Sequence, residues 1–208
     1  IGTHAGITVG EDGATHQMLE DINLMRAMPN MLVISPSDDI QAKILIKKLA
    51  EYEGPAYVRV SRMKTPVIYE GLTEDNFEIG KGIQIGKGTD ATIFATGDLL
   101  SEALKAQKLL KKANYDVRVV DIHTIKPIDE ELIIKCAQET NKLYSLENHS
   151  ITGGLGTAIA EVLCDKYPHQ LSRFGMENEF GRSGTPADLL KYYKLDAESI
   201  VNKILLEK

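Results

Sequence analysis

The chain of 208 residues is 43% hydrophobic and 26% charged, a composition typical of a folded globular protein that argues against intrinsic disorder. Its formal net charge of −6 disfavours nucleic acid as a partner, because phosphate backbones are bound mainly through clustered Lys and Arg. No apolar run reaches the roughly 20 residues of a membrane-spanning helix, so we expect a soluble, cytoplasmic protein. Cys136 and Cys164 lie in apolar helical patterns without Cys-x-x-Cys spacing, which predicts reduced core thiols.

The first segment, residues 3–16, reads T-H-A-G-I-T-V-G-E-D-G-A-T-H and predicts a glycine-rich loop. His4 and His16 bracket Glu11 and Asp12 within it. A neutral imidazole can transfer protons near pH 7, and a carboxylate accepts hydrogen bonds from hydroxyl groups. The loop is therefore interpreted as a site for a polyol or sugar; solvent-exposed histidines without a role and a metal site are the alternatives. Backbone freedom or close approach to a ligand is expected at the glycines at positions 2, 6, 10 and 13.

Strand and helix patterns alternate after this loop. Apolar spacing predicts a helix over residues 18–28 with its methionines in the core. A strand is predicted over 31–34, a helix that begins at 35–38, and a second strand over 56–60. That strand leaves Arg62 at its carboxyl end, where ligands bind in open α/β sheets. Arg62 suits bidentate contact with a phosphate, and a surface salt bridge explains it equally well.

From residue 61 to about 76 the periodicity lapses, which predicts a linker. A second α/β unit follows, in which strands and helices alternate as in a parallel sheet with crossover helices. Its strands are predicted over 91–96, 117–122 and 143–146, and its helices over 99–113, 129–139, 155–166, 187–193 and 197–207.

The run Gly153-Gly154-Leu155-Gly156 follows a strand and opens a helix, as a dinucleotide-binding motif does. Ile159 stands where the third glycine of that motif belongs. Close packing of the helix against the sheet is therefore the preferred interpretation.

Residues 3–17 resemble the signature of the pyrimidine-binding domain of transketolases, and the similarity continues through 24–31, 36–38 and 61–62. Residues 94–97, 121–127 and 147–156 are similar to a transketolase-type C-terminal domain. The resemblance implies an incomplete thiamine-diphosphate pyrimidine-binding domain over 1–65, a linker over 66–76, and a doubly wound, mostly parallel C-terminal-type domain over 77–208. The chain is most similar to the C-terminal subunit of a transketolase split over two genes; an internal fragment of a fused enzyme is the other possibility.

The resemblance also implies roles for four residues. His4 would contact the sugar phosphate, and Asp12 would bind a substrate hydroxyl and favour one stereochemistry at C2. His16 would lie beside the cofactor and the C1 oxygen of the substrate, and Arg62 would hold the phosphate group. His4 and His16 are thus the expected catalytic residues of an enzyme that moves a two-carbon ketol unit from a ketose to an aldose phosphate.

In such an enzyme the cofactor is thiamine diphosphate with Mg²⁺ or Ca²⁺, and the resemblance implies that residues outside this chain mainly hold it. The glutamate that activates the cofactor has no counterpart here and is not assigned. The expected partner is an N-terminal transketolase subunit with the diphosphate-binding domain, in an α2β2 heterotetramer or around a homodimer of this chain. The chain alone is expected to be inactive, with exposed apolar surface and open sheet edges beside the strands over 31–34 and 56–60.

Three other functions remain open at this stage. Two are enzymes of the same architecture: 1-deoxyxylulose-5-phosphate synthase and the beta subunit of a 2-oxoacid dehydrogenase. The pair of histidines around Glu11 and Asp12 looks more like transketolase than either. The third is a non-catalytic dimerisation or assembly module, which is a role implied for the segment after residue 76.

Overall fold

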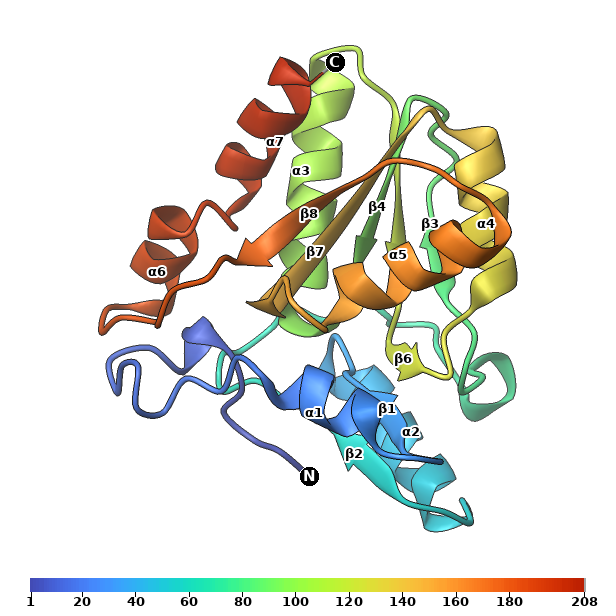
Figure 1. Ribbon diagram of the computed structural model, residues 1–208, viewed down its shortest axis with the longest axis vertical. Helices are drawn as coiled ribbons and strands as arrows, with labels where there is room; N and C mark the ends of the chain where they lie inside the picture. The colour runs from blue at the N-terminus through green and yellow to red at the C-terminus, as the bar shows by residue number, and fades with distance from the viewer. Residues whose placement is uncertain (208) are drawn as a thin grey trace.

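The computed structural model describes residues 1–207 as two β-sheets with helices packed on them (Figure 1). The smaller sheet has the strand order β2-β1-β6, and the larger has the order β3-β5-β4-β7-β8. The strands are β1 (Leu32–Ile34), β2 (Ala56–Val58), β3 (Ile83–Ile85), β4 (Ala91–Ala95), β5 (Val117–Asp121), β6 (Thr124–Lys126), β7 (Lys142–Ser150) and β8 (Leu171–Met176). The α-helices are α1 (Asp21–Ala27), α2 (Asp39–Ala50), α3 (Leu100–Lys112), α4 (Glu130–Glu139), α5 (Leu155–Lys166), α6 (Pro186–Tyr192) and α7 (Ala197–Leu206).

The larger sheet is buried on both faces, as expected for parallel strands with crossover helices. Strands β5, β4, β7 and β8 run parallel, and only the edge strand β3 is antiparallel to its neighbour. Along β4, Ile93 packs with α3 and α7, whereas the next residue, Phe94, packs with α4 and α5. Figure 1 shows these two pairs of helices on opposite sides of the sheet. This is the doubly wound, mostly parallel fold that the sequence predicts.

The smaller sheet joins segments that lie far apart in the sequence. Strand β1 pairs in parallel with β2 and antiparallel with β6, which directly follows β5 of the larger sheet. All three residues of β1 are buried. The expectation of an open edge beside residues 31–34 is therefore wrong, because β6 covers it. Strand β2 lies at the edge of its sheet and Ala56 is exposed there, but Gly2 is hydrogen-bonded to Val58 and Val60 and covers the carboxyl end of that edge.

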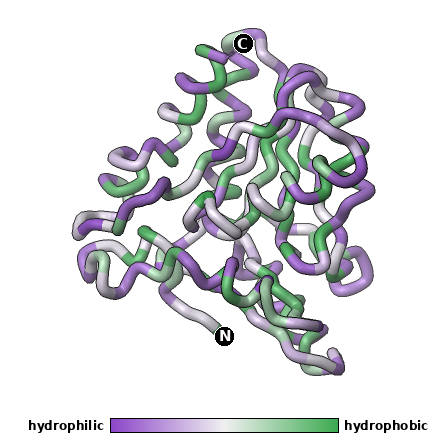
Figure 2. The backbone as a smooth tube through the Cα atoms, in the orientation of Figure 1, coloured by the Kyte–Doolittle hydropathy of each residue, from purple (hydrophilic) through white to green (hydrophobic). Residues whose placement is uncertain are grey.

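The observed helix bounds agree best with the predicted ones where the apolar stripe is long. Helix α5, for example, has the bounds predicted from the sequence. Helix α2 begins at Asp39 rather than over 35–38, because the Asp38 carboxylate accepts a hydrogen bond from the Gln41 N–H and caps the helix there. In Figure 2, hydrophobic and hydrophilic positions alternate along the helices, as amphipathic packing requires.

Two predictions about the core are wrong. Helix α1 begins at Asp21, so Met18 precedes it, and Met28 follows its end in extended backbone with 47% of its surface exposed. The methionines therefore lie at the rim of the core. Cys136 is buried as expected, but Cys164 lies on an exposed position of α5. Across residues 1–207, the helices are all too short or too polar to span a bilayer.

Candidate active-site loop

The glycine-rich segment forms an irregular loop around one short 3-10 helix, Ile7–Val9, whose three residues are buried. Ile7 joins the core of the larger sheet, so the loop is anchored by its apolar centre. Three of the four glycines singled out from the sequence have positive φ. Of these three, Gly6 is held most closely, since a Cβ there would lie 2.3 Å from the Asn148 side chain. A larger residue at position 6 would displace the loop.

His4 and His16 both lie exposed on this loop. His4 has φ of 63°, a left-handed conformation that costs a non-glycine residue about 1 kcal/mol or more. Such strain persists where the surroundings hold it, and it clusters at functional sites. The Thr15 hydroxyl lies 3.0 Å from His16 Nδ1. Among the described residues, no hydrogen bond or ion pair joins either histidine to Asp12 or Arg62.

The structure does bring Asp12 and Arg62 together. Arg62 Nη1 donates to Asp12 Oδ2 at 3.0 Å and to the Val9 carbonyl at 3.1 Å. Both side chains are nearly half exposed, at 43% and 46%. Because only Nη1 is used in these contacts, the rest of the guanidinium can donate to a phosphate without breaking them. The sequence offers a salt bridge and a phosphate contact as alternative explanations of Arg62. In this geometry Arg62 can make both at once.

Side chains from two distant segments, and one at the end of the loop itself, hold the buried part of the loop. Asn148, in β7, accepts a hydrogen bond from the Ile7 N–H at 2.8 Å and donates through Nδ2 to Thr8 Oγ1 and Asp98 Oδ2 at 2.8 and 2.9 Å. The Thr8 hydroxyl donates to the same Asp98 oxygen at 2.7 Å. Gln17 braces the other side, where its Nε2 donates to the Arg182 carbonyl at 2.8 Å.

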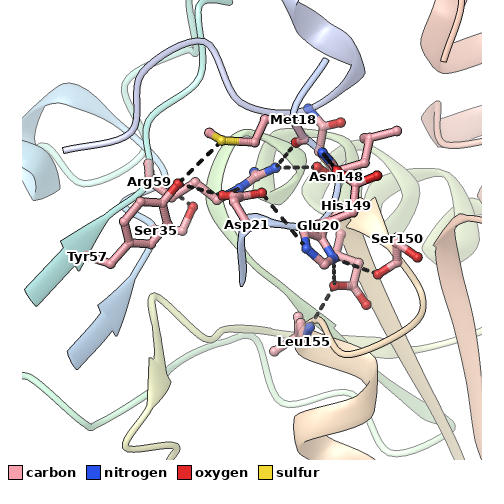
Figure 3. A network of polar contacts seen from close by, with 12 residues as sticks. Met18, Glu20, Asp21, Ser35, Tyr57, Arg59, Asn148, His149, Ser150 and Leu155 are labelled. Carbon is pink, nitrogen blue, oxygen red and sulfur yellow. Dashed lines mark hydrogen bonds and ion pairs between the residues drawn. The ribbon is translucent and has the colours of Figure 1, made fainter. Parts of the chain in front are cut away.

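A buried ion pair lies directly behind this loop (Figure 3). Arg59 Nε donates to Asp21 Oδ2 at 2.8 Å, and both side chains are 3% exposed. The Tyr57 hydroxyl donates to the same oxygen at 2.7 Å, and Arg59 Nη2 donates to the Asn148 carbonyl at 2.7 Å. The pair therefore ties the N-terminus of α1 to the strand that leads to Arg62 and to β7.

The glycine-rich run at the start of α5 is a packing motif, as preferred from the sequence. Its helix N-terminus is closed by a buried carboxylate, since Glu147 accepts hydrogen bonds from the Leu155 and Gly156 N–H groups at 2.6 and 2.9 Å. A Cβ at Gly154 would lie 1.9 Å from Glu147 Oε2. A side chain at this position would therefore collide with the carboxylate that caps the helix.

Burial shifts the ionisation of two residues beside this cap. It raises the pKa of Glu147 to about 7, although the two N–H donors of α5 favour the charged form. Burial, with the nearby positive charge of Arg59, lowers the pKa of His149 to about 4. His149 Nδ1 lies 2.7 Å from the Ser150 carbonyl, which makes it the protonated nitrogen of the neutral ring.

The open cavity nearest to the ends of β1 and β2 has a volume of about 450 Å³. Ser37, Ser61, Lys64 and Asp98 contribute to its lining, but His4, Asp12, His16 and Arg62 do not. The four predicted residues thus lie on an exposed surface of the chain. Within residues 1–207, no three His, Cys, Asp or Glu side chains converge as a metal site.

Sequence reasoning missed the residues that hold the loop, although two signals point to them. Arg59 is a charged residue inside an apolar strand pattern, which requires a buried partner. Glu147, Asn148 and His149 extend the predicted strand over 143–146 at the carboxyl end of a parallel strand, where functional groups collect.

The chain is thus an α/β protein with a three-stranded and a five-stranded sheet, and its loop of histidines and acids is hydrogen-bonded to a strand of each. Two family sequence patterns match it: "Transketolase, pyrimidine binding domain" over residues 1–67 and "Transketolase, C-terminal domain" over residues 80–200. The chain belongs to the transketolase family.

Individual relatives agree with this assignment. The chain is 51% identical over all its 208 residues to a Methanocaldococcus jannaschii protein described as a transketolase C-terminal section, of which it covers 65%. It is 37% identical over 99% of its length to a subunit of the apulose-4-phosphate transketolase of Phocaeicola vulgatus, again covering 65%. A solved structure described as a split gene transketolase, inactive beta4 tetramer, matches with a TM-score of 0.86 and 43% identity, over 96% of this chain and 63% of that one. The chain thus spans just under two thirds of these proteins.

Proposed function

We propose that this chain supplies the sugar-binding part of a thiamine-diphosphate-dependent transketolase that transfers a two-carbon ketol unit between ketose and aldose phosphates. The observation that carries the proposal is the anchored loop. Its centre is buried and hydrogen-bonded, while His4, Asp12 and His16 are exposed on it and Arg62 is bonded to it. A rigid loop with exposed polar groups can orient a polyol phosphate at little entropic cost.

Each of the four residues has a role that its surroundings permit. Arg62 binds the phosphate group through the N–H groups that its contact with Asp12 leaves unused. Asp12 accepts a hydrogen bond from a sugar hydroxyl. His4 contacts the sugar phosphate, and His16 lies beside the cofactor and the C1 oxygen, where a neutral imidazole can donate or accept a proton.

The residues of this chain fit the sugar end of such a site better than the diphosphate end, because the imidazoles and the carboxylate of the loop suit hydroxyl groups and protons. Thiamine diphosphate, with Mg²⁺ or Ca²⁺, supplies the nucleophilic carbon of the reaction when bound. In this proposal its diphosphate and metal are held by residues outside 1–208, and His16 is the contact from this chain.

The proposed assembly joins this chain to an N-terminal transketolase subunit in an α2β2 heterotetramer, or around a homodimer of this chain, in the cytoplasm. The exposure of the loop supports an additional chain over it, since active sites of this kind exclude water. The name of the related split gene transketolase records an inactive tetramer of beta chains. We accordingly propose that this chain is inactive without its partner.

The test is an assay of ketol transfer from xylulose 5-phosphate to ribose 5-phosphate by the purified protein, alone and with the N-terminal subunit. Activity that requires both proteins and thiamine diphosphate is expected. Robust activity of this chain alone would overturn the proposed division of the site. Decarboxylation of pyruvate without ketose turnover would assign a different enzyme of the same architecture, and binding of the partner without any activity would indicate an assembly module.

Replacement of Arg62 by alanine is expected to raise KM for a phosphorylated ketose about 10- to 100-fold, because a charge-assisted bidentate contact is lost. KM for the unphosphorylated ketose should change by less than about twofold, and the free energy of unfolding by about 1 kcal/mol or less, since the ion pair with Asp12 is exposed. Steady-state kinetics of the reconstituted enzyme with xylulose 5-phosphate and xylulose measure the difference.

Lys43→Ala is the matched control, because Lys43 also forms an exposed ion pair, with Asp39 on α2. It should leave both KM values unchanged. Equal increases for the two ketoses in Arg62→Ala would show that Arg62 supports the loop rather than the phosphate.

A further inference from the structure

We propose that Asn148, Asp98 and Thr8 form a loop clamp that sets the position of the sugar-binding loop, with Asn148 as a positioning residue for catalysis. The inference rests on the proposed function for its kinetic consequences, but its structural part can be tested without it. None of the three side chains is assigned a contact with substrate or cofactor. They act through the loop that carries His4, Asp12 and His16.

The loop clamp is a closed set of hydrogen bonds in a dry environment. Thr8 is fully buried, and Asp98 and Asn148 are 3% and 1% exposed. Every pair among the three side chains is hydrogen-bonded, at 2.7 to 2.9 Å. Because the acceptor is a buried carboxylate, each donor that is lost leaves a charged group partly unsatisfied, which is far more costly than a lost surface contact.

The clamp holds the loop backbone as well as one of its side chains. Asn148 Oδ1 accepts the Ile7 N–H at 2.8 Å, at the first residue of the 3-10 helix. Gly6 packs so closely on the Asn148 side chain that a Cβ there would lie 2.3 Å from it. The Asn148 side chain therefore holds the backbone at Gly6 and Ile7, directly after His4, by a hydrogen bond and by close packing.

The same residue also connects to the strand that leads to Arg62. The carbonyl of Asn148 accepts a hydrogen bond from Arg59 Nη2 at 2.7 Å, three residues before Arg62 (Figure 3). One residue of β7 is thus bonded to both chain segments that carry the proposed sugar contacts. Asn148 and Asp98 belong to the part matched by the C-terminal domain pattern, residues 80–200. That part consequently shapes the site in addition to any role in assembly.

Hydrogen exchange of this chain tests the clamp directly. Asn148→Ala removes the acceptor of the Ile7 N–H and the donor to Thr8 and Asp98. Exchange of the Ile7 amide is expected to accelerate at least about five- to tenfold, since the loss of one net hydrogen bond already has that effect. Thr8→Val keeps the shape of the side chain but removes its hydroxyl, and should accelerate exchange across residues 4–17. Thr8→Ser should restore protection. Amides of β4 and β5 should exchange at the same rate in these three variants as in wild type.

Thr92→Val is the matched control for Thr8→Val. Thr92, in β4, is also fully buried, and its hydroxyl bonds at 2.9 Å to the hydroxyl of Thr140, the residue that follows α4. Loss of that bond should not change exchange in the loop. Loop protection that stays at the wild-type level in both Asn148→Ala and Thr8→Val would overturn the clamp, as would equal acceleration by Thr92→Val.

Kinetics of the reconstituted enzyme test the catalytic consequence. Asn148→Ala and Thr8→Val are each expected to lower kcat/KM for ketol transfer about tenfold or more, because small displacements of orienting groups have large effects on rate. Thr8→Ser and Thr92→Val should stay within about twofold of wild type. Accelerated exchange with unchanged kcat/KM would refute the positioning role. If wild type itself transfers no ketol unit, the proposed function fails and the exchange result still decides whether the clamp exists.

Discussion

Arg59→Ala is expected to lower the free energy of unfolding by about 3 to 5 kcal/mol, because it leaves the buried Asp21 carboxylate without its counter-charge. Both side chains are 3% exposed, so water cannot take the place of the guanidinium. The carbonyl of Asn148 loses a donor in the same step. The remaining donor to Asp21, the Tyr57 hydroxyl, is neutral and cannot balance the charge. Unfolding by urea, followed by circular dichroism, measures the effect.

Two further variants make the Arg59 experiment specific. Arg59→Lys keeps the charge, but a single ammonium cannot reach the Asp21 carboxylate and the Asn148 carbonyl as the guanidinium does, so only part of the stability should return. Lys47→Ala removes an exposed ion pair with Glu74 and should cost about 1 kcal/mol or less. A loss below about 1 kcal/mol in Arg59→Ala would show that the protein can neutralise or rehydrate Asp21, which contradicts its burial in the fold.

The sequence predicts those parts of the fold that are determined by local periodicity. Helix α5 has a sustained apolar stripe, and its bounds agree with the prediction. Strand β6 escaped prediction because it has three residues and is defined by pairing with β1, some ninety positions earlier. The same tertiary pairing closes the edge of β1 that was expected to be open. Strand β8 contains Gly175 and is only partly buried, so it lacks the apolar pattern of a core strand.

For the candidate site, the sequence predicts the exposed side chains but not the buried residues that hold the loop in place. His4, Asp12 and His16 fall within one continuous motif, and Arg62 follows a recognisable strand. Their support comes from Asp98 and Asn148, which are brought to Thr8 by the order of strands in the larger sheet. No local pattern encodes that proximity. A polar residue next to a buried strand is the only trace that such a partner leaves in a single sequence.

Glu147 and His149 are expected to change stability with pH in opposite directions. Burial raises the pKa of Glu147 from 4.5 to about 7, so the folded state binds more protons than the unfolded state between these values and stability falls as pH rises. Burial lowers the pKa of His149 from 6.5 to about 4, so the unfolded state binds more protons there and stability increases with pH. Each effect is about 3 kcal/mol in size, and together they nearly cancel in the wild-type protein.

Substitution of either Glu147 or His149 should reveal the contribution of that residue to the pH dependence of stability, by comparison with wild type. Relative to Glu147→Gln, wild type should lose about 3 kcal/mol of stability between pH 4.5 and 7, and relative to His149→Gln it should gain a similar amount between pH 4 and 6.5. Urea unfolding across this range supplies both differences. His149 Nδ1 lies 3.7 Å from Glu147 Oε2, so each difference also includes the change that the substitution causes in the pKa of the other residue. The Glu147 result decides between two physical effects. If its difference instead rises with pH, the N–H donors of Leu155 and Gly156 outweigh burial and keep the carboxylate charged in the fold.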